Sequence, residues 1–159
     1  MRQVHSSRSH QYQRGVAVVE LAMVLPMLTM LLIGVVNLGL VVREFQILQN
    51  AAREGAHYSS LFGNEIVSAL PLGDAAAQAA IRTTIQDRVV NYLAQEGITI
   101  ARSDVTVDQT YPLNVGGGLT VTGSKITVTY SRATLIALSS WLPLGSVTLK
   151  GESFFRNFY

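Results

Sequence analysis

The chain has 159 residues, and its composition points towards a membrane. Hydrophobic residues make up 48% of it and charged residues only 14%, against about 25% in an ordinary soluble protein. So much apolar content excludes a disordered chain, and the length allows one domain or a membrane segment with one small domain. Because the sequence contains no cysteine, disulfides and thiolate zinc sites are excluded as well.

The basic charge is concentrated at the N-terminus. The net charge is +2, yet residues 1–15 alone carry three arginines and no acid, which leaves 9 basic and 10 acidic side chains for residues 16–159. These remaining charges are scattered singly, whereas a nucleic-acid-binding domain needs a dense basic patch. We therefore expect a basic leader at residues 1–15, too polar over residues 1–14 to order itself, and no nucleic-acid partner.

A long apolar segment follows the leader. Glu20 is the single charged residue between positions 16 and 42, and the 22 residues from 21 to 42 have none. As a helix this uncharged stretch spans about 33 Å, enough to cross about 30 Å of hydrocarbon, and it is too long for the core of a secretory signal peptide. Because arginines are more numerous on the N-terminal flank, we expect a transmembrane helix over 16–42, kinked near Pro26, with a cytoplasmic N-terminus.

The helical pattern continues beyond the apolar segment. Apolar and small residues recur every three or four positions over 43–60, which predicts an extramembrane continuation of the same helix. A turn is expected at 63–73, followed by a second helix over 75–96 with Asp74 as its N-cap and Gly97 as its C-cap. The apolar stripe of this second helix consists of Ala77, Ile81, Ile85, Val89, Tyr92 and Leu93.

After Gly97 the pattern changes to period two, which is typical of strands. Apolar residues alternate with polar ones in five stretches, and turns are expected at 114–118 and 123–124. The stretches contain Ile98 and Ile100; Val105 and Val107; Leu119 and Val121; Ile126, Val128 and Tyr130; and Val147 to Leu149. A long helix, a shorter helix and a small antiparallel sheet predict an α+β fold, with residues 61–159 forming the head.

Two apolar clusters allow more than one interpretation. Residues 133–145, which contain Trp141, form either a buried connection or a surface for a partner. Residues 154–159 hold four aromatic residues in six, and these either pack against the long helix or offer an edge to a partner subunit.

The most specific local pattern surrounds Glu20. An ionisable group costs about 2.5 to 3.5 kcal/mol at the centre of a membrane helix and less near its end, so it usually has a task or a partner there. Arg14, Gly15, Val16 and three further apolar residues precede Glu20. This order resembles the cleavage motif of type IV prepilins, in which a leader is removed after the glycine and a glutamate stands fifth in the mature chain. The alternative is an acid near the helix end that reaches the headgroups and does nothing.

The resemblance extends to one branch of that superfamily. Residues 24–26 (Val-Leu-Pro), 37–39 (Asn-Leu-Gly) and 48–58 resemble the TadE-like proteins of the tight-adherence (Tad/Flp) pilus system, and the likeness covers residues 14 to about 60 in detail. Two positions depart from the pattern: Leu21 stands where many members have an aromatic residue, and Asn37 where many have an acid.

The family motif within residues 48–58 has a plainer alternative. It contains Asn50, Ala51, Arg53, Glu54 and Gly55. By periodicity alone, these residues indicate an ordinary amphipathic helix whose charged side chains are solvated, and only the resemblance favours a function for them.

The resemblance implies a minor pilin or pseudopilin needed for pilus assembly. A prepilin peptidase would cleave between Gly15 and Val16, with Arg14 and Glu20 completing the processing site. The chain would cross the bacterial inner membrane once, with its head in the periplasm or, within a pilus, outside the cell. Implied partners are the prepilin peptidase, the Tad membrane platform, TadF-like subunits, the Flp major pilin and membrane lipid.

The implied assembly mechanism depends on three residues of the apolar helix. Cleavage would create an amine at Val16, and the carboxylate of Glu20 in a neighbouring subunit would pair with it, so that two costly charges offset each other. Pro26 belongs to the same assembly helix.

Two other classes of function compete with this one. The first is an uncleaved, single-pass, membrane-anchored adhesin or envelope accessory binding module. The second is a membrane-tethered enzyme, which would need a pocket of converging polar groups. With three histidines, two of them in the leader, the sequence offers almost no material for a metal site or a catalytic triad. We therefore expect no enzymatic activity, no metal and no cofactor.

Overall fold

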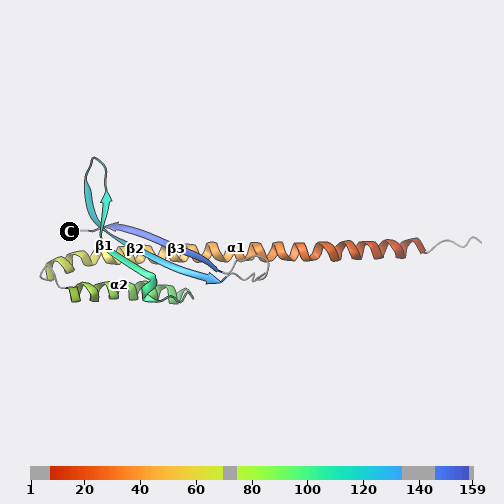
Figure 1. Ribbon diagram of the computed structural model, residues 1–159, viewed down its shortest axis with the longest axis horizontal. Coiled ribbons are helices and arrows are strands. Elements are labelled where there is room, and N and C mark those ends of the chain that lie inside the picture. Colours follow the sequence, from red (N-terminus) through yellow and green to blue (C-terminus); the bar gives the residue numbers. More distant parts are fainter. Residues whose placement is uncertain (1–7, 70–74, 134–145, 158–159) are drawn as a thin grey trace, which may run out of the picture. The chain divides into compact units, whose positions relative to one another are not determined.

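The computed structural model describes residues 8–69, 75–133 and 146–157. It contains helices α1 (Arg8–Ala69) and α2 (Ala75–Gln95), a short 3-10 helix η1 (Arg102–Asp104), and strands β1 (Val105–Asn114), β2 (Thr120–Ala133) and β3 (Ser146–Arg156) (Figure 1). The strands form one antiparallel sheet in the order β1-β2-β3. The predicted α+β class, with a long first helix, a second helix and a small antiparallel sheet, is confirmed.

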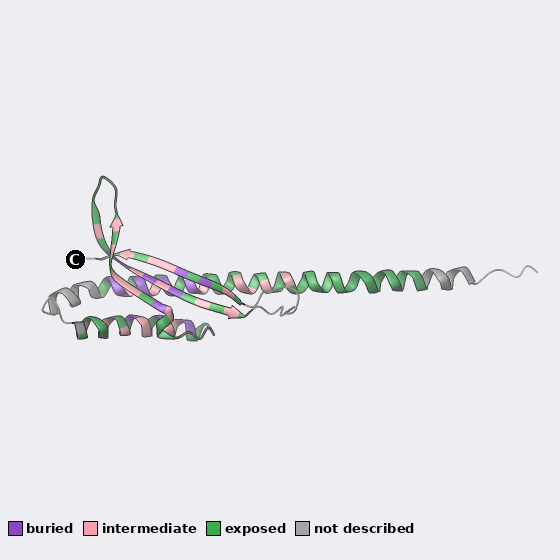
Figure 2. Ribbon diagram, in the orientation of Figure 1, coloured by how far each residue is buried: buried purple, intermediate pink, exposed green. Residues whose placement is uncertain are grey.

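The chain divides into two compact units, Met1–Leu40 and Val41–Tyr159. They are called from here on the N-terminal unit and the head, so that the head now includes residues 41–60 in addition to the 61–159 expected from the sequence. Helix α1 contributes residues to both. In the N-terminal unit every residue from 15 to 33 is exposed (green in Figure 2). In the head, buried residues (purple) occur on α1, α2 and the strands.

Helix α1 is longer than expected at both ends. It begins at Arg8, inside the segment expected to lack order, and ends at Ala69, so the turn expected at 63–73 is wrong over 63–69. Extending an existing helix adds one hydrogen bond for each residue fixed, which offsets the cost of about 1 kcal/mol for a glycine such as Gly63. Pro26 lies inside α1. The predicted N-cap Asp74 is outside the described residues.

Helix α2 follows its predicted pattern closely. Ile85, Val89 and Leu93 are almost completely buried, and the helix ends at Gln95, one position before the predicted end. Gly97 has φ +81° and closes the helix in the predicted left-handed conformation. The Ile98 N–H donates to the carbonyl of Leu93 at 2.8 Å, which completes a Schellman motif.

The β1–β2 hairpin confirms the turn predicted at 114–118, because Gly116, Gly117 and Gly118 all have positive φ. The turn predicted at 123–124 is wrong, since both residues lie within β2. A Cβ on Gly123 would lie 2.4 Å from Leu113 Cδ1 and 2.6 Å from the Phe155 carbonyl oxygen. This glycine therefore marks a close approach within the sheet, a contact between distant residues that local sequence does not reveal.

The strand predicted at 98–100 is also absent. These residues connect α2 to η1 without strand structure. Ile98 is nevertheless buried, as part of the core that includes Leu93. Its alternation with polar neighbours reflects burial of one side chain and exposure of the next, which a loop packed on the core produces as readily as a strand.

The core of the head forms where α1, α2 and the sheet meet. A Cβ on Gly151 of β3 would lie 2.6 Å from the carbonyl oxygen of Leu48, and one on Gly55 would lie 2.5 Å from Val89 Cγ2. Small residues thus bring α1 into direct contact with both β3 and α2. The buried apolar residues are Leu48, Ala51, Ala52, Ala56, Ile85, Val89, Leu93, Ile98, Val105, Ile126, Val128 and Leu149.

In the C-terminal aromatic segment, one phenylalanine packs against the long helix and the other is exposed, so each of the two interpretations holds for one residue. The Phe155 ring contacts the His57 ring of α1 edge to face, with centroids 5.6 Å apart, whereas Phe154 is 59% exposed. Asn157 is buried and donates from its side-chain amide to the carbonyl of Gln109 at 3.2 Å. Gln109 lies at the register shift of β1, so the segment stabilises this irregularity. Residues 158–159, like the apolar cluster at 134–145, lie outside the described residues.

Candidate assembly site on the first helix

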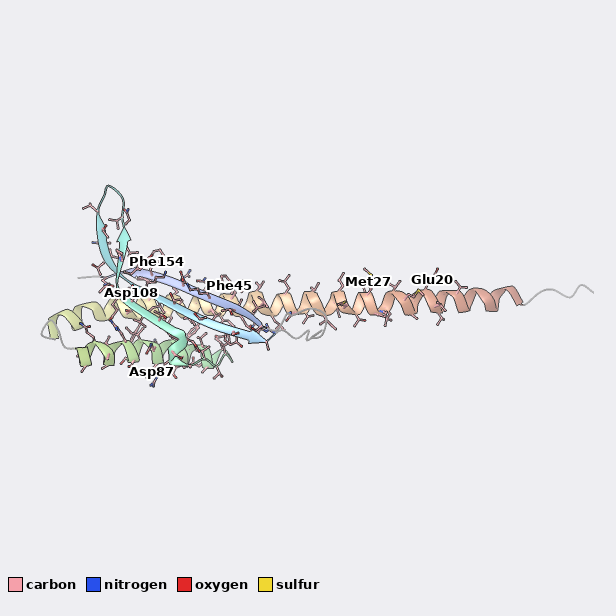
Figure 3. The ribbon with its side chains drawn as sticks, viewed as in Figure 1. Glu20, Met27, Phe45, Asp87, Asp108 and Phe154 are labelled. Atoms are coloured by element: carbon pink, nitrogen blue, oxygen red, sulfur yellow. The ribbon has the colours of Figure 1, made fainter. Side chains whose placement is uncertain are left out.

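The predicted processing residues lie in the N-terminal unit on α1. Gly15, Val16 and Glu20 are exposed, and a Cβ on Gly15 would meet nothing within 4 Å. Residues four apart lie on the same face of a helix, so Val16 and Glu20 face the same way, about 6 Å apart along the axis. Figure 3 shows the Glu20 side chain projecting from α1. The side chain of Arg14 is not described.

Apolar side chains surround Glu20 along the helix. Leu21 is 61% exposed and Met27 is 75% exposed, and Figure 3 shows Met27 projecting from the helix as Glu20 does. Within the described part of the chain, no side chain forms an ion pair or hydrogen bond with Glu20. Pro26 lacks an N–H, so the helical hydrogen bond to the carbonyl of Ala22 is missing.

The apolar part of α1 is a candidate membrane anchor. Among the described residues, the segment Gly15–Leu61 is the one stretch of helix long and apolar enough to cross a membrane, judged by length and composition, and its most apolar window is not buried in the protein. Exposed aliphatic side chains are costly in water at about 25 cal/mol per Å², whereas a lipid environment accepts them.

The predicted motif helix, residues 50–55, divides into two faces. Ala51 and Gly55 are buried and allow the close packing of α1 in the head, while Asn50 and Arg53 are exposed. Glu54 accepts hydrogen bonds from Arg88 of α2 through one oxygen, at 2.9 Å from Nη2 and 3.3 Å from Nε. Packing therefore accounts for the small residues of the motif, and an ion pair joining two helices accounts for its acid.

Comparison with known proteins finds a family match over part of α1. A family model described as "TadE-like protein" matches residues 15–57. The matched residues 15–57 resemble TadE-like proteins and are called here the TadE-like segment. Neither a curated protein nor a solved structure matches the chain. The match begins at Gly15 and ends at His57, so it includes Gly15, Val16 and Glu20 of the candidate processing site, the apolar helix and the motif helix, but not Arg14. The family is one associated with the Tad pilus system.

A second ion pair joins the TadE-like segment to the sheet. Glu44 Oε1 of α1 lies 3.1 Å from Arg132 Nη1 of β2, and the two side chains are only 20% and 11% exposed. The other carboxylate oxygen of Glu44 is buried and has no hydrogen-bond partner among the described residues. Local sequence patterns do not indicate this pair, because Glu44 and Arg132 are separated by most of the head.

The TadE-like segment also lines a cavity that sequence reasoning missed. The cavity has a volume of about 270 Å³. Its lining combines four residues of α1 with one of α2 and one of β3, namely Asn50, Arg53, Glu54, His57, Tyr92 and Phe155. The spacing of the four α1 residues places them on one helix face, but the contributions of α2 and β3 depend on the tertiary fold. Within the described residues, no group of three His, Asp or Glu side chains is arranged to hold a metal ion.

Proposed function

We propose that this protein is a minor pilin or pseudopilin, cleaved by a prepilin peptidase between Gly15 and Val16 and needed for assembly of a Tad-type pilus. The supporting observation is the family match that begins at Gly15 and includes Glu20, a carboxylate exposed on an apolar helix without a partner in the described residues. The negative charge of Glu20 is therefore available to pair with a positive charge of a neighbouring subunit.

The proposed chemistry of assembly follows from two charges. Cleavage after Gly15 frees the amine of Val16 at the membrane boundary. An isolated amine and an isolated carboxylate are each costly to bury in an apolar environment, and pairing offsets both costs. When the Glu20 carboxylate of one subunit meets the Val16 amine of the next, the pair forms only at the correct stagger of the two helices. The charges thus specify register, while the exposed aliphatic side chains provide the contact area.

The proposed topology places the N-terminus in the cytoplasm and the head in the periplasm. The three arginines of the leader, compared with Arg43 and Arg53 shortly after the apolar segment, support this orientation. In this arrangement the leader reaches a peptidase from the cytoplasmic side, and the head can contact other pilin-like subunits and the membrane platform.

The substitution Glu20→Ala tests the proposed assembly mechanism. We expect normal removal of the leader and a normally folded head, but no incorporation of the subunit and loss of pili. The measurement is a comparison of pilus output and of the subunit content of sheared pili with the wild type. Thr29→Ala is the matched control, because the Thr29 hydroxyl donates only to the carbonyl of Leu25 within the same helix, at 2.8 Å. Normal pili containing the Glu20→Ala subunit would contradict the proposal.

A further inference from the structure

Asn50 and Arg53 are exposed on α1, and neither packing nor an ion pair of the described head explains them. Asn50, Arg53, Glu54 and His57 recur at the spacing of one helix face and line the 270 Å³ cavity together with Tyr92 and Phe155. We propose that this cavity, called here the Arg53 cavity, receives the carboxylate of an acidic side chain from a neighbouring pilin-like subunit. The inference rests on the proposed function, because it requires subunits that lie side by side.

The charges of the Arg53 cavity favour an anion. Glu54 is already paired with Arg88, whose guanidinium also lies over the Tyr58 ring at 5.2 Å from its centroid. Arg53 is exposed and forms no ion pair or hydrogen bond with the described residues. The cavity therefore holds one positive charge that the head does not neutralise.

The chemistry of the lining fits a carboxylate on a short aliphatic stem. The guanidinium of Arg53 presents N–H donors in a planar fork that matches the two oxygens of a carboxylate. The side-chain amide of Asn50 adds further donors. The rings of Tyr92 and Phe155 supply apolar surface for the methylene groups of an aspartate or glutamate.

The size of the cavity favours a protein side chain over a small-molecule ligand. Sites for cofactors and drug-sized ligands have volumes of about 300 to 1,000 Å³ and enclose most of the ligand. The Arg53 cavity has a volume of about 270 Å³, at the lower end of this range, and its arginine is exposed, so the cavity does not enclose a ligand. A single exposed ion pair contributes too little binding free energy to hold a free anion. Subunits already held together by their helices present the carboxylate at high effective concentration, so that a weak pair is enough to select a neighbour.

A zero-length crosslink provides the test. Arg53→Lys places an amine in the cavity, and a carbodiimide joins an amine only to a carboxylate that touches it. Arg82→Lys is the matched control, because Arg82 is also exposed and also lacks an ion pair in the described part of the chain. The full-length variants are treated in membranes of cells that make pili, and crosslinked peptides are identified by mass spectrometry.

We expect the amine at position 53 to form crosslinks with an aspartate or glutamate of another pilin-like subunit, at a yield several-fold above that at position 82. Equal yields at the two positions, or crosslinks at position 53 confined to acids of the same chain such as Glu54, would overturn the inference. Because the Arg53 side chain has no partner in the described head, the thermal unfolding of Arg53→Lys should match that of the wild type.

Failure of this inference can be distinguished from failure of the proposed function. If deletion of the whole protein leaves pilus output unchanged, the proposed function is wrong and this inference falls with it. If pili require the protein but the crosslink yield at position 53 does not exceed that at position 82, the proposed function stands and only the inference of an acidic partner at the Arg53 cavity is wrong. Arg53→Glu, which reverses the charge, should lower pilus output relative to Arg82→Glu, and equal output from the two would again count against the Arg53 cavity.

Discussion

Two regions of helix α1 differ in the size and the burial of their apolar residues. Between residues 15 and 33 every residue is exposed, including large side chains such as Met23, which is 76% exposed. Between residues 48 and 60 the buried positions are mostly small, as at Ala51 and Gly55. In the head, small residues allow the backbone of α1 to lie close to its neighbours. In the N-terminal unit, large apolar side chains project from α1 and are exposed. An added methyl group should therefore destabilise the head, where the backbones are in close contact, and should have little effect in the N-terminal unit.

The largest effect of size is expected at Gly151. In Gly151→Ala the new Cβ would lie 2.6 Å from the carbonyl oxygen of Leu48, which belongs to the backbone of α1 and cannot turn aside. We expect a loss of about 3 kcal/mol in the free energy of unfolding of the head, at the upper end of overpacking costs. Thermal or urea unfolding of the detergent-solubilised chain measures it.

The same substitution in the other region is the control. A Cβ on Gly39 would meet nothing within 4 Å, so Gly39→Ala should leave the unfolding of the head unchanged. Equal destabilisation by the two substitutions would show that close approach to α1 is not what distinguishes the two regions.

The second largest effect is expected at the Glu44–Arg132 pair. In Arg132→Ala the carboxylate of Glu44, only 20% exposed, loses the cation 3.1 Å away. We expect a loss of about 2 kcal/mol in stability, less than for a fully buried pair because some water reaches the site. Replacing both residues, as in Glu44→Leu with Arg132→Met, should recover part of this loss. A double variant that is less stable than Arg132→Ala would contradict the pair as described.

A smaller effect is expected at Gly55. In Gly55→Ala the new Cβ would lie 2.5 Å from Val89 Cγ2, a side-chain atom that can shift more easily than backbone. Alanine favours a helix over glycine by about 1 kcal/mol, which offsets part of an overpacking cost of about 1 to 3 kcal/mol. We expect a net loss of about 1 kcal/mol in the free energy of unfolding. A stability gain would mean that α1 and α2 are not in close contact here.

The smallest effect is expected from the pH dependence of Glu152. Hydrogen bonds from Lys150 and Lys125 hold the pKa of this carboxyl below its ordinary value of 4.5. Because the lowered pKa belongs to the folded state, the stabilisation is present above pH 4.5 and is lost as the pH falls through the folded-state pKa. Unfolding measured across this range should show a slightly steeper loss of stability for the wild type than for Glu152→Gln. Parallel curves would show that the two lysines do not act on Glu152 in the folded state.

Local sequence patterns predicted α2 and most of the sheet. The stripe that includes Ile85 and Val89 repeats at the helical period, and Gly97 marks the helix end, because both depend on neighbours within a few residues. The extension of α1 to Ala69 was missed, since Gly63 and Asn64 resemble a turn locally but are tolerated once the helix exists.

The candidate site was predictable only in part. The spacing of Gly15 and Glu20 along the chain is enough to propose processing, because a peptidase reads a short stretch of sequence. The Arg53 cavity was not predictable, since it exists only where Tyr92 of α2 and Phe155 of β3 reach the motif helix. The close contact of Gly151 with α1 depends on the fold in the same way.

Cleavage after Gly15 is tested most directly by the intact mass of the protein recovered from membranes of cells with and without the prepilin peptidase. We expect the chain to lose residues 1–15 only when the peptidase is present, with Val16 as the new N-terminus. A chain that still begins at Met1 in both strains would contradict this expectation. Glu20 would then have no mature N-terminus to pair with, and an uncleaved, membrane-anchored binding module would explain the apolar helix better.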